Sequence, residues 1–304
     1  MADLTLSSPA SKGLSVEEQR MSAVSAFRMT DKAFHGVTFA AALFVLVLLG
    51  AIILSLIVGA WPAIEKFGAG FLYGERWSVN KEIFGALSPI YGTLMTSLIA
   101  MIIAVPVGLG IAIFLTELCP IALRRPIGIA IELLAGIPSI IYGIWGFFTL
   151  TPFFGQTLLT ASLILAIMVL PFVTAISRDV FSTVPPVLKE AAFGIGCTTW
   201  EVARNVVLPY TRVGVVGGVM LGLGRALGET MAVTFVIGNS HAIAGSLLAP
   251  ATTISATIAN EFQESDGIYR SALLELGLLL FVITFIVLAI ARIMLLRLER
   301  KAGA

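Results

Sequence analysis

The chain has 304 residues, of which 58% are hydrophobic and only 12% charged, and its formal net charge is +1. This composition excludes an ordinary soluble domain. A net charge this small says nothing by itself about partners, and we expect no nucleic acid among them. The two cysteines, Cys119 and Cys197, lie far apart in the sequence, which excludes a disulfide framework.

Six apolar runs are near or above the ~20 residues that a helix needs to cross a bilayer. They cover residues 36–60, 88–118, 126–150, 157–176, 206–237 and 272–296. The chain is therefore predicted to be an all-α polytopic membrane protein with six transmembrane helices. The transmembrane domain spans residues 36–298, between a polar tail of residues 1–35 and a short tail of residues 299–304.

The basic residues predict how this domain is oriented. If the N-terminus is cytoplasmic, fourteen of the nineteen lysines and arginines fall on the cytoplasmic side and four on the other, with Arg225 inside the membrane. The positive-inside rule therefore places both termini and the loop of residues 178–209 in the cytoplasm.

The third apolar run is interrupted at residues 136–139, where Gly136 and Pro138 disfavour a continuous helix. Membrane helices tolerate such a break when neighbouring groups satisfy the freed backbone, or when the break lines a polar cavity, and both interpretations remain open. We single out Ser139, because its hydroxyl group follows directly on the loosened backbone.

The fifth run contains small residues at a spacing of four, at Gly214, Gly218 and Gly222. At ~100° per residue of helix, these glycines share one narrow stripe with Arg225 and Glu229. Small residues at this spacing let a second helix approach closely in lipid. Because a lone charge in mid-bilayer costs at least ~2.5–3.5 kcal/mol, Arg225 and Glu229 are expected to face the protein interior or a partner.

Two interpretations of the charged pair remain open. Arg225 and Glu229 are four residues apart and can simply neutralise each other across one helical turn. Alternatively, the pair lies on a substrate pathway, because a guanidinium group is well suited to bind a tetrahedral oxyanion and Thr230 adds a hydroxyl group.

The loop of residues 178–209 contains a short sequence that favours a helix, a turn and re-entry into the membrane. Its marker residues are Glu190, Ala191, Ala192, Gly196, Leu208 and Pro209. This pattern resembles the EAA loop of ABC-importer permeases, which in that family forms a coupling helix in a cleft of the ATP-hydrolysing subunit. Ala203 departs from the family pattern, which often has a bulky apolar residue there.

Further segments resemble the phosphate-specific permeases of that family. GRALGETMAV (Gly224–Val233) is similar to their signature, and FGALSPIYGT (Phe84–Thr93) is similar to the PstC-type subunit and not to its PstA-type partner. LLAGIPSIIYG (Leu133–Gly143) and SATIANEF (Ser255–Phe262) also resemble this family. The resemblance covers about residues 36–298.

The resemblance implies a MetI-like importer-permease core with a cytoplasmic coupling helix, in a bacterial inner membrane. It also implies a PstA-type second permease, an ATPase dimer and an extracytoplasmic phosphate-binding protein as partners. ATP would be bound by the ATPase subunits, so we expect this chain to have no cofactor, no metal and no catalytic residue of its own.

Other classes of function fit the residues less well. A self-sufficient secondary transporter or channel would use Arg225 and Glu229 as an ion or proton relay, but no convincing internal repeat accompanies them. A membrane-embedded enzyme would need a catalytic cluster, yet the only histidines, His35 and His241, are predicted on opposite sides of the membrane. The sequence also contains no Walker-type phosphate loop.

Overall fold

The computed structural model describes the backbone of residues 16–302 and the side chains of residues 31–297. The predicted tails are therefore described only from residue 16 onward and up to residue 302. Within the described residues the chain is helical apart from connecting loops and two isolated β-bridges. The α-helices are α1 (Val16–Phe67), α2 (Gly70–Tyr73), α3 (Leu87–Ile113), α4 (Ile121–Ala135), α5 (Ser139–Thr149), α6 (Thr151–Phe154), α7 (Leu158–Ser182), α8 (Pro186–Gly194), α9 (Thr199–Val202), α10 (Leu208–Leu227), α11 (Met231–Thr234), α12 (Ile254–Glu261) and α13 (Gly267–Ala302).

Two compact units make up the chain, residues 1–55 and residues 56–304. The described part of the first unit is a single stretch of α1. The second unit contains the end of α1 and all other helices, and the functional features described below belong to it.

In the part of the chain that the structure describes, five helical segments are long and apolar enough to cross a membrane. They are Asp31–Phe67, Leu87–Leu118, Leu158–Ser182, Thr199–Leu227 and Gly267–Arg297. A sixth candidate is the pair α4 and α5, which is bent by 90° at its short break. The prediction of an all-α polytopic membrane protein is confirmed, with the third predicted span present as this bent pair.

The bend follows from the residues between α4 and α5. Gly136 ends α4, and Pro138 precedes the first residue of α5. Proline lacks a backbone N–H group and disfavours helical geometry in the residue before it, so one continuous helix cannot form here.

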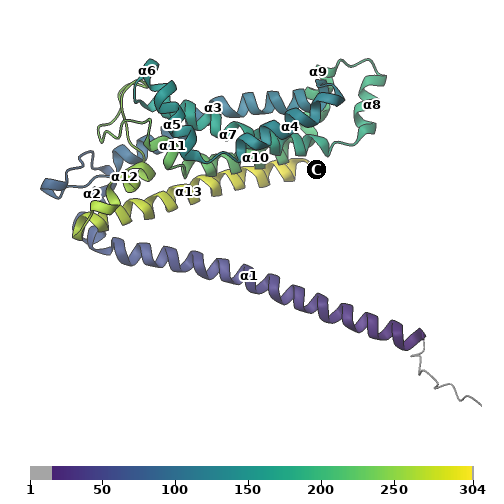
Figure 1. Cartoon of the computed structure of the whole chain (residues 1–304), viewed down its shortest axis with the longest axis horizontal. Helices are drawn as coiled ribbons and strands as arrows, with labels where there is room; N and C mark the ends of the chain where they lie inside the picture. Colours follow the sequence, from purple (N-terminus) through teal and green to yellow (C-terminus); the bar gives the residue numbers. More distant parts are fainter. Residues whose placement is uncertain (1–15, 303–304) are drawn as a thin grey trace, which may run out of the picture. The chain divides into compact units, whose positions relative to one another are not determined.

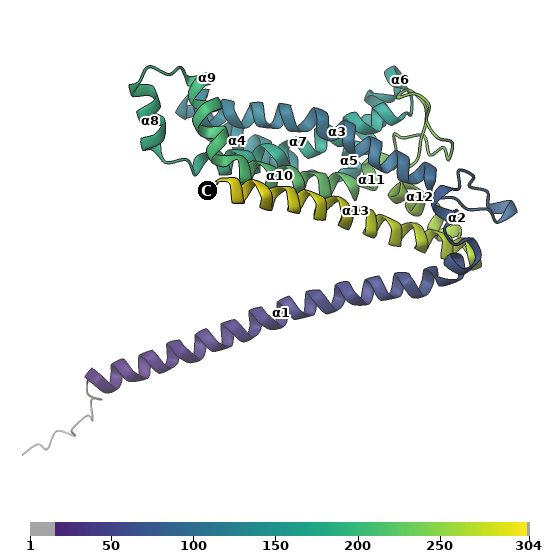
Figure 2. The same cartoon turned by 180° about the vertical axis from the view of Figure 1, so that it is seen from behind.

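Helix α7 is the central element of the second unit. More of its most apolar window is buried than in any other candidate span, 61%. It packs against α3, where Gly108 lies close to Val173 and the Thr174 hydroxyl donates to the Gly108 carbonyl at 3.4 Å. Figures 1 and 2 show α3, α7, α10 and α13 running side by side.

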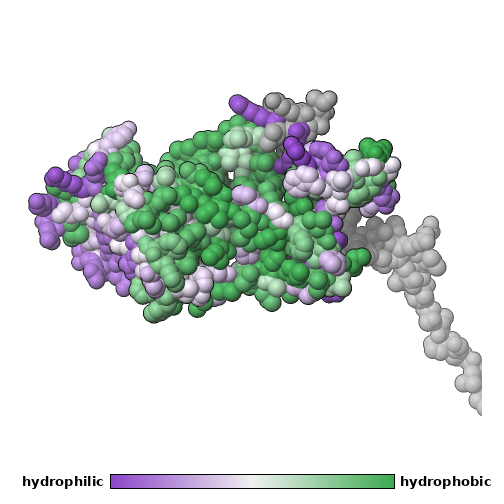
Figure 3. All heavy atoms as spheres, turned by 90° about the horizontal axis from the view of Figure 1, so that it is seen from above, coloured by the Kyte–Doolittle hydropathy of each residue, from purple (hydrophilic) through white to green (hydrophobic). Residues whose placement is uncertain are grey.

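The two ends of this bundle carry different elements. Helices α8 and α9 lie at one end, together with the C-terminal end of α13, while α2, α6 and α12 lie at the opposite end (Figures 1 and 2). On the face in Figure 3, hydrophobic residues cover the middle of the bundle and hydrophilic residues gather toward its ends. This distribution is the one expected for a protein surrounded by lipid.

Several predicted helix ends differ from the structure: α1, for example, continues through Pro62 to Phe67, seven residues beyond the predicted end of the first run. Helix α7 continues to Ser182, six residues beyond the predicted end of the fourth run. Helix α10 stops at Leu227, so the prediction of a fifth helix that reaches residue 237 is wrong. The helix ends here because Gly228 follows, and because the Glu229 carboxylate accepts a hydrogen bond from the Ala232 N–H at 3.2 Å, which starts α11 as a separate short helix.

Candidate functional site

The sequence around Glu190 forms the short helix α8. Its first residue is Pro186, whose fixed φ suits the first turn and whose missing N–H needs no partner there. Gly196 follows the helix with φ +92°, a left-handed conformation that glycine adopts without strain. The chain then enters α9 through a capping box, in which Thr198 and Glu201 each accept a backbone hydrogen bond from the other.

Helix α8 presents one buried and one exposed face. Ala192 is buried in a cluster with Phe181 and Val202, whereas Glu190 and Ala191 are exposed. Large apolar side chains are exposed on and after the helix, with exposed fractions of 70% for Val187, 83% for Ile195 and 62% for Trp200. Packing within this chain does not account for the exposure of these apolar side chains to water. Their exposure therefore indicates a docking face, that is, a surface that another protein covers.

A partly buried ion pair links α8 to the end of α3. The Lys189 ammonium lies 2.6 Å from the Glu117 carboxylate, and the side chain of Glu117 is only 6% exposed. Glu117 belongs to the π-helical turn Phe114–Leu118 that follows α3. The pair is partly buried, because the Lys189 side chain is 21% exposed, and it joins α8 directly to this turn of a membrane span. Sequence reasoning missed this pair.

The chain re-enters the membrane through a second π-helical turn, Ala203–Val207. Leu208 begins α10 and Pro209 lies in its first turn, directly after the π-helical turn and within the continuous helical segment Thr199–Leu227. Ala203 is 1% exposed and belongs to the packed base of this turn, so the small side chain at this position is tightly enclosed.

The glycines of α10 face α7. A Cβ atom added at Gly214 would lie 2.6 Å from Val180, and one added at Gly218 would lie 2.7 Å from Ile176. At Gly222 an added Cβ would lie 3.1 Å from Val173. These three residues therefore lie where α10 and α7 approach most closely.

Arg225 and Glu229 do not form the predicted contact across one helical turn. Arg225 is exposed in the last turn of α10, whereas Glu229 lies beyond the end of the helix and caps α11. Among the described side chains, no ion pair includes either residue. Thr230 is partly buried, and its hydroxyl donates to the Gly228 carbonyl at 3.4 Å. Arg225 and Glu229 therefore do not neutralise each other through a direct ion pair.

The break before α5 lies close to this region. Ser139 is partly buried at the start of α5, and Tyr142, one turn later, lies within electrostatic reach of Arg225. The Tyr142 hydroxyl donates to the carbonyl of Leu134 at 2.8 Å, across the 90° bend. Helix α5 also packs on α11, because a Cβ added at Gly143 would lie 3.0 Å from the Ala232 backbone. The bend, Arg225 and the start of α11 are thus brought together.

Glu275 is a buried carboxyl group that sequence reasoning missed. It lies in α13, is 7% exposed, and its Oε2 atom has no hydrogen-bond partner. A carboxyl group inside the apolar run of residues 272–296 was the available signal. Within the described residues, no three side chains of His, Cys, Asp or Glu converge in a way that could hold a metal ion.

A polar and aromatic cluster closes the end of the bundle opposite α8. The Glu261 carboxylate lies 2.9 Å from His241 Nε2 and accepts hydrogen bonds from the Trp77 indole at 2.8 Å and from the Tyr269 hydroxyl. Trp77 stacks on His241 with ring centroids 5.2 Å apart. Burial raises the pKa of Glu261, but the hydrogen bonds from His241, Tyr269 and Trp77 outweigh it and hold the pKa below its ordinary value.

Known proteins with similar sequences cover nearly the whole chain. Residues 105–300 match the family model described as "Binding-protein-dependent transport system inner membrane component". The phosphate transport system permease protein PstC of Mesorhizobium japonicum is 60% identical over 317 aligned residues, which cover 95% of this chain and 97% of that protein. The protein of the same name from Pasteurella multocida is 52% identical and covers 91% of this chain and 93% of its own length.

A solved structure supports the fold independently. A chain of a bacterial alginate ABC transporter, solved in complex with an alginate pentasaccharide-bound periplasmic protein, superposes with a TM-score of 0.61. The match covers 86% of this chain and 94% of that chain, at 14% sequence identity, and so bears on the fold alone. The chain therefore belongs to the family of binding-protein-dependent transport system inner membrane components and, within it, to the PstC family of phosphate transport system permease proteins.

Proposed function

We infer that the chain is the transmembrane permease subunit of an ATP-driven importer of inorganic phosphate. It forms half of the translocation pathway and couples to a separate ATPase. The observation that supports this most strongly is 60% identity to a phosphate permease over 95% of the chain. The predicted alternative, a self-sufficient transporter with an Arg225–Glu229 relay, loses its structural basis because α10 ends before Glu229.

We propose α8 as the coupling helix. Its exposed Glu190 and Ala191, with the apolar side chains beside them, form the face that enters a cleft of the ATPase. The Lys189–Glu117 ion pair then transmits a displacement of α8 to the end of α3. ATP is bound and hydrolysed by the partner, so this chain needs no cofactor and is not itself an enzyme.

The substrate pathway is proposed to pass Arg225, Thr230 and Ser139. Arg225 supplies a guanidinium group that is exposed in this chain, on a helix otherwise packed against α7. A planar guanidinium can donate two parallel hydrogen bonds to the oxygens of a phosphate ion. Glu229 acts indirectly in this proposal. Its carboxylate accepts a hydrogen bond from the Ala232 N–H and so fixes the start of α11.

The complex is proposed to contain a PstA-type second permease, two ATPase subunits and an extracytoplasmic phosphate-binding protein. We place it in the bacterial inner membrane with both termini in the cytoplasm. The common position of α8 and the C-terminal end of α13 at one end of the bundle supports this orientation (Figure 1). Labelling of engineered cysteines at residues 195–200 from outside intact cells would contradict it.

The function is tested by deletion and reconstitution. Cells that lack the chain should lose high-affinity phosphate uptake, and the chain purified in mild detergent should co-elute with an ATPase and a second permease. In liposomes, that complex with a phosphate-binding protein should accumulate phosphate only when ATP is supplied on the α8 side. Accumulation by the chain alone, without ATP, would refute the proposal.

A further inference from the structure

A groove of about 760 Å³ lies between α4, α7 and α8, at the end of the bundle that carries α8. Three membrane-spanning segments begin or end around it: Leu87–Leu118 ends beside it, α4 begins at Ile121, and α7 ends at Ser182. The groove therefore lies at the level where spans leave the hydrocarbon region, which is where lipid headgroups lie.

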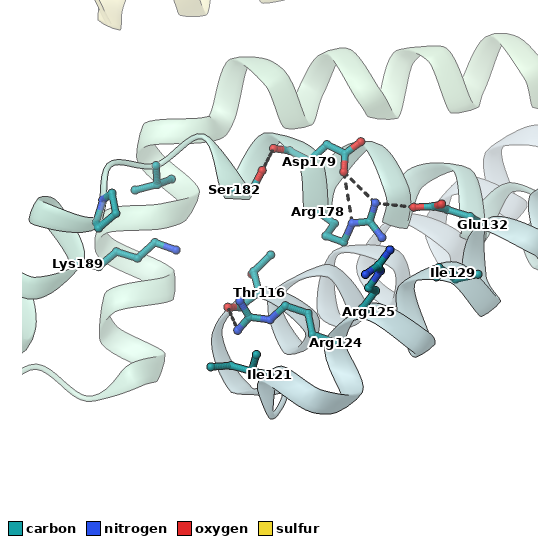
Figure 4. Close-up of a pocket in the computed structure, with 12 residues that line it drawn as sticks. Thr116, Ile121, Arg124, Arg125, Ile129, Glu132, Arg178, Asp179, Ser182 and Lys189 are labelled. Atoms are coloured by element: carbon teal, nitrogen blue, oxygen red, sulfur yellow. Dashed lines mark hydrogen bonds and ion pairs between the residues drawn. The ribbon is translucent and has the colours of Figure 1, made fainter.

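Four cationic side chains line this groove: Arg124, Arg125, Arg178 and Lys189. Figure 4 shows Arg124, Arg125 and Lys189 extending into the space between the three helices.

Two of these cations are already paired. Arg178 Nη2 lies 2.6 Å from Glu132 and 3.0 Å from Asp179, and Lys189 pairs with Glu117. The carboxylates of Glu117, Glu132 and Asp179 around the groove are therefore already paired with Arg178 or Lys189.

Among residues 31–297, Arg124 and Arg125 are the two cations of the groove without a carboxylate partner, and the four cations exceed the three carboxylates of Glu117, Glu132 and Asp179 by one charge. The Arg124 guanidinium donates to the carbonyl of Thr116 at 2.7 Å, which holds it against the wall without neutralising its charge. Two adjacent arginines at the start of α4 thus provide guanidinium forks that match the oxygens of a phosphate group.

Part of the remaining lining is apolar, beside the hydroxyl groups of Thr116 and Ser182. Ile121, Ile129 and Val184 line the groove, and Ile121 is 86% exposed. An exposed isoleucine beside two arginines that lack carboxylate partners, in a groove of net positive charge, suits a ligand that is anionic at one end and apolar next to it. Free phosphate offers only the first property, whereas an anionic phospholipid offers both, and basic pockets between membrane helices are known to bind such headgroups.

We propose that this groove binds the phosphate group of an anionic phospholipid, with Arg124 and Arg125 contacting the phosphodiester oxygens and Ile121 and Ile129 contacting the glycerol and upper acyl chain. A bound lipid would bridge α4 and α7 beside the Lys189–Glu117 pair and so brace the base of α8.

The test measures lipid retained by the purified complex, using native mass spectrometry after addition of dioleoylphosphatidylglycerol, with phosphate-free dioleoylglycerol as the reference. The double variant R124Q/R125Q should reduce retention of phosphatidylglycerol by about tenfold or more, since each basic group near a headgroup contributes on the order of 1 kcal/mol. R124K/R125K should retain an intermediate amount, because the charge remains but the paired donors are lost.

The matched control is R76Q/K81Q, which removes the same number of exposed cations from the opposite end of the bundle. It should leave retention unchanged. Equal retention by R124Q/R125Q and the control, with the ATPase still co-purifying, would overturn the proposal.

Two further outcomes would also overturn the lipid assignment. One is binding of inorganic phosphate that R124Q/R125Q abolishes, without any retention of phosphatidylglycerol, which would make the free anion the occupant. The other is loss of the ATPase from R124Q/R125Q with lipid retention unchanged, which would make the groove a protein contact.

Discussion

The two ends of the helical bundle differ in how their polar and apolar side chains are arranged. At the end that carries α12, polar groups satisfy one another: Glu261 accepts from Trp77 and Tyr269 and pairs with His241. At the end that carries α8, the large side chains of Ile195 and Trp200 are left exposed. The polar cluster at the first end is held together by contacts within this chain, while the apolar side chains around α8 have the features of a surface that a partner completes. The predictions below test that difference, from the largest expected effect to the smallest.

The stability of the end that carries α12 should be very sensitive to a larger side chain at Gly92. A Cβ atom at this position of α3 would collide with the backbone carbonyl of Thr252, a contact that cannot be relieved by a side-chain rotation. The next residue, Thr93, accepts a hydrogen bond from the Ile254 N–H at 3.0 Å, so the two segments cannot separate freely. Gly92→Val should destabilise the protein by ~3 kcal/mol or more, seen as a lower thermal midpoint in detergent.

The control lies on the same helix. Gly110 has no heavy atom within 4 Å of the place its Cβ would occupy, and it is exposed. Gly110→Ala should leave the midpoint nearly unchanged. Equal effects of the two substitutions would show that this end is not closely packed.

Substitutions at the end that carries α8 should reduce the stimulation of ATP hydrolysis by phosphate. They should leave the stability of the protein unchanged. Gly196 has φ +92° and open space around it, so Gly196→Val strains only the turn after α8. We expect the complex to assemble while phosphate-stimulated ATP hydrolysis falls about tenfold or more, because a displacement of ~1 Å in a coupled element is costly. Glu190→Lys should have the same result, since it reverses the charge on the docking face.

Gly194→Ala is the matched control for the turn. It lies two residues earlier, also has open space around it, and has no left-handed φ. ATP hydrolysis at the normal rate is expected for this variant. Full stimulation in Gly196→Val and Glu190→Lys as well would exclude α8 as the coupling element.

The polar cluster should make the opposite end sensitive to acid. The folded protein holds the pKa of Glu261 below its ordinary value of 4.5, so the unfolded chain takes up the proton more readily. The stability that this carboxylate contributes is complete above pH 4.5 and is lost as the pH falls toward the folded-state pKa. The thermal midpoint should therefore drop below pH 4.5, and the drop should be smaller in Glu261→Gln. Identical pH profiles for the two proteins would contradict this role.

The smallest expected effect concerns the coupling between Arg225 and Glu229. Since the two side chains form no ion pair, a double-mutant cycle on thermal stability with Arg225→Gln and Glu229→Gln should give an interaction energy within about 0.5 kcal/mol of zero. Glu229→Gln alone should cost about 1 kcal/mol, as expected when the hydrogen bond from the Ala232 N–H is weakened. An interaction energy well above 1 kcal/mol would show that the two side chains do form a direct ion pair.

Much of the fold could be predicted from local sequence. Apolar runs of the right length predicted the membrane helices, and the spacing of Gly214, Gly218 and Gly222 predicted residues that the structure places against α7. The break at Pro138 was visible because a proline acts on its immediate neighbours. Its 90° angle was not, because the angle depends on packing against α11.

What the sequence did not reveal depends on distant residues. Lys189 and Glu117 are 72 positions apart, and Trp77 and Glu261 are 184 apart, so no local pattern predicts either contact. The end of α10 was missed because the stripe was extended through Gly228 as if the helix continued. Whether Glu229 continues one helix or caps the next is decided by a single hydrogen bond to Ala232.

The central claim is that α8 is the surface a soluble ATPase completes, and photo-crosslinking tests it most directly. A photoreactive amino acid replaces Ala191, which is exposed on α8, and in a second protein it replaces Val79, which is 47% exposed at the opposite end. In the assembled complex, we expect a covalent product with the ATPase subunit from position 191 and none from position 79. An assembled complex that gives no ATPase product from position 191, or equal amounts from both positions, would contradict it.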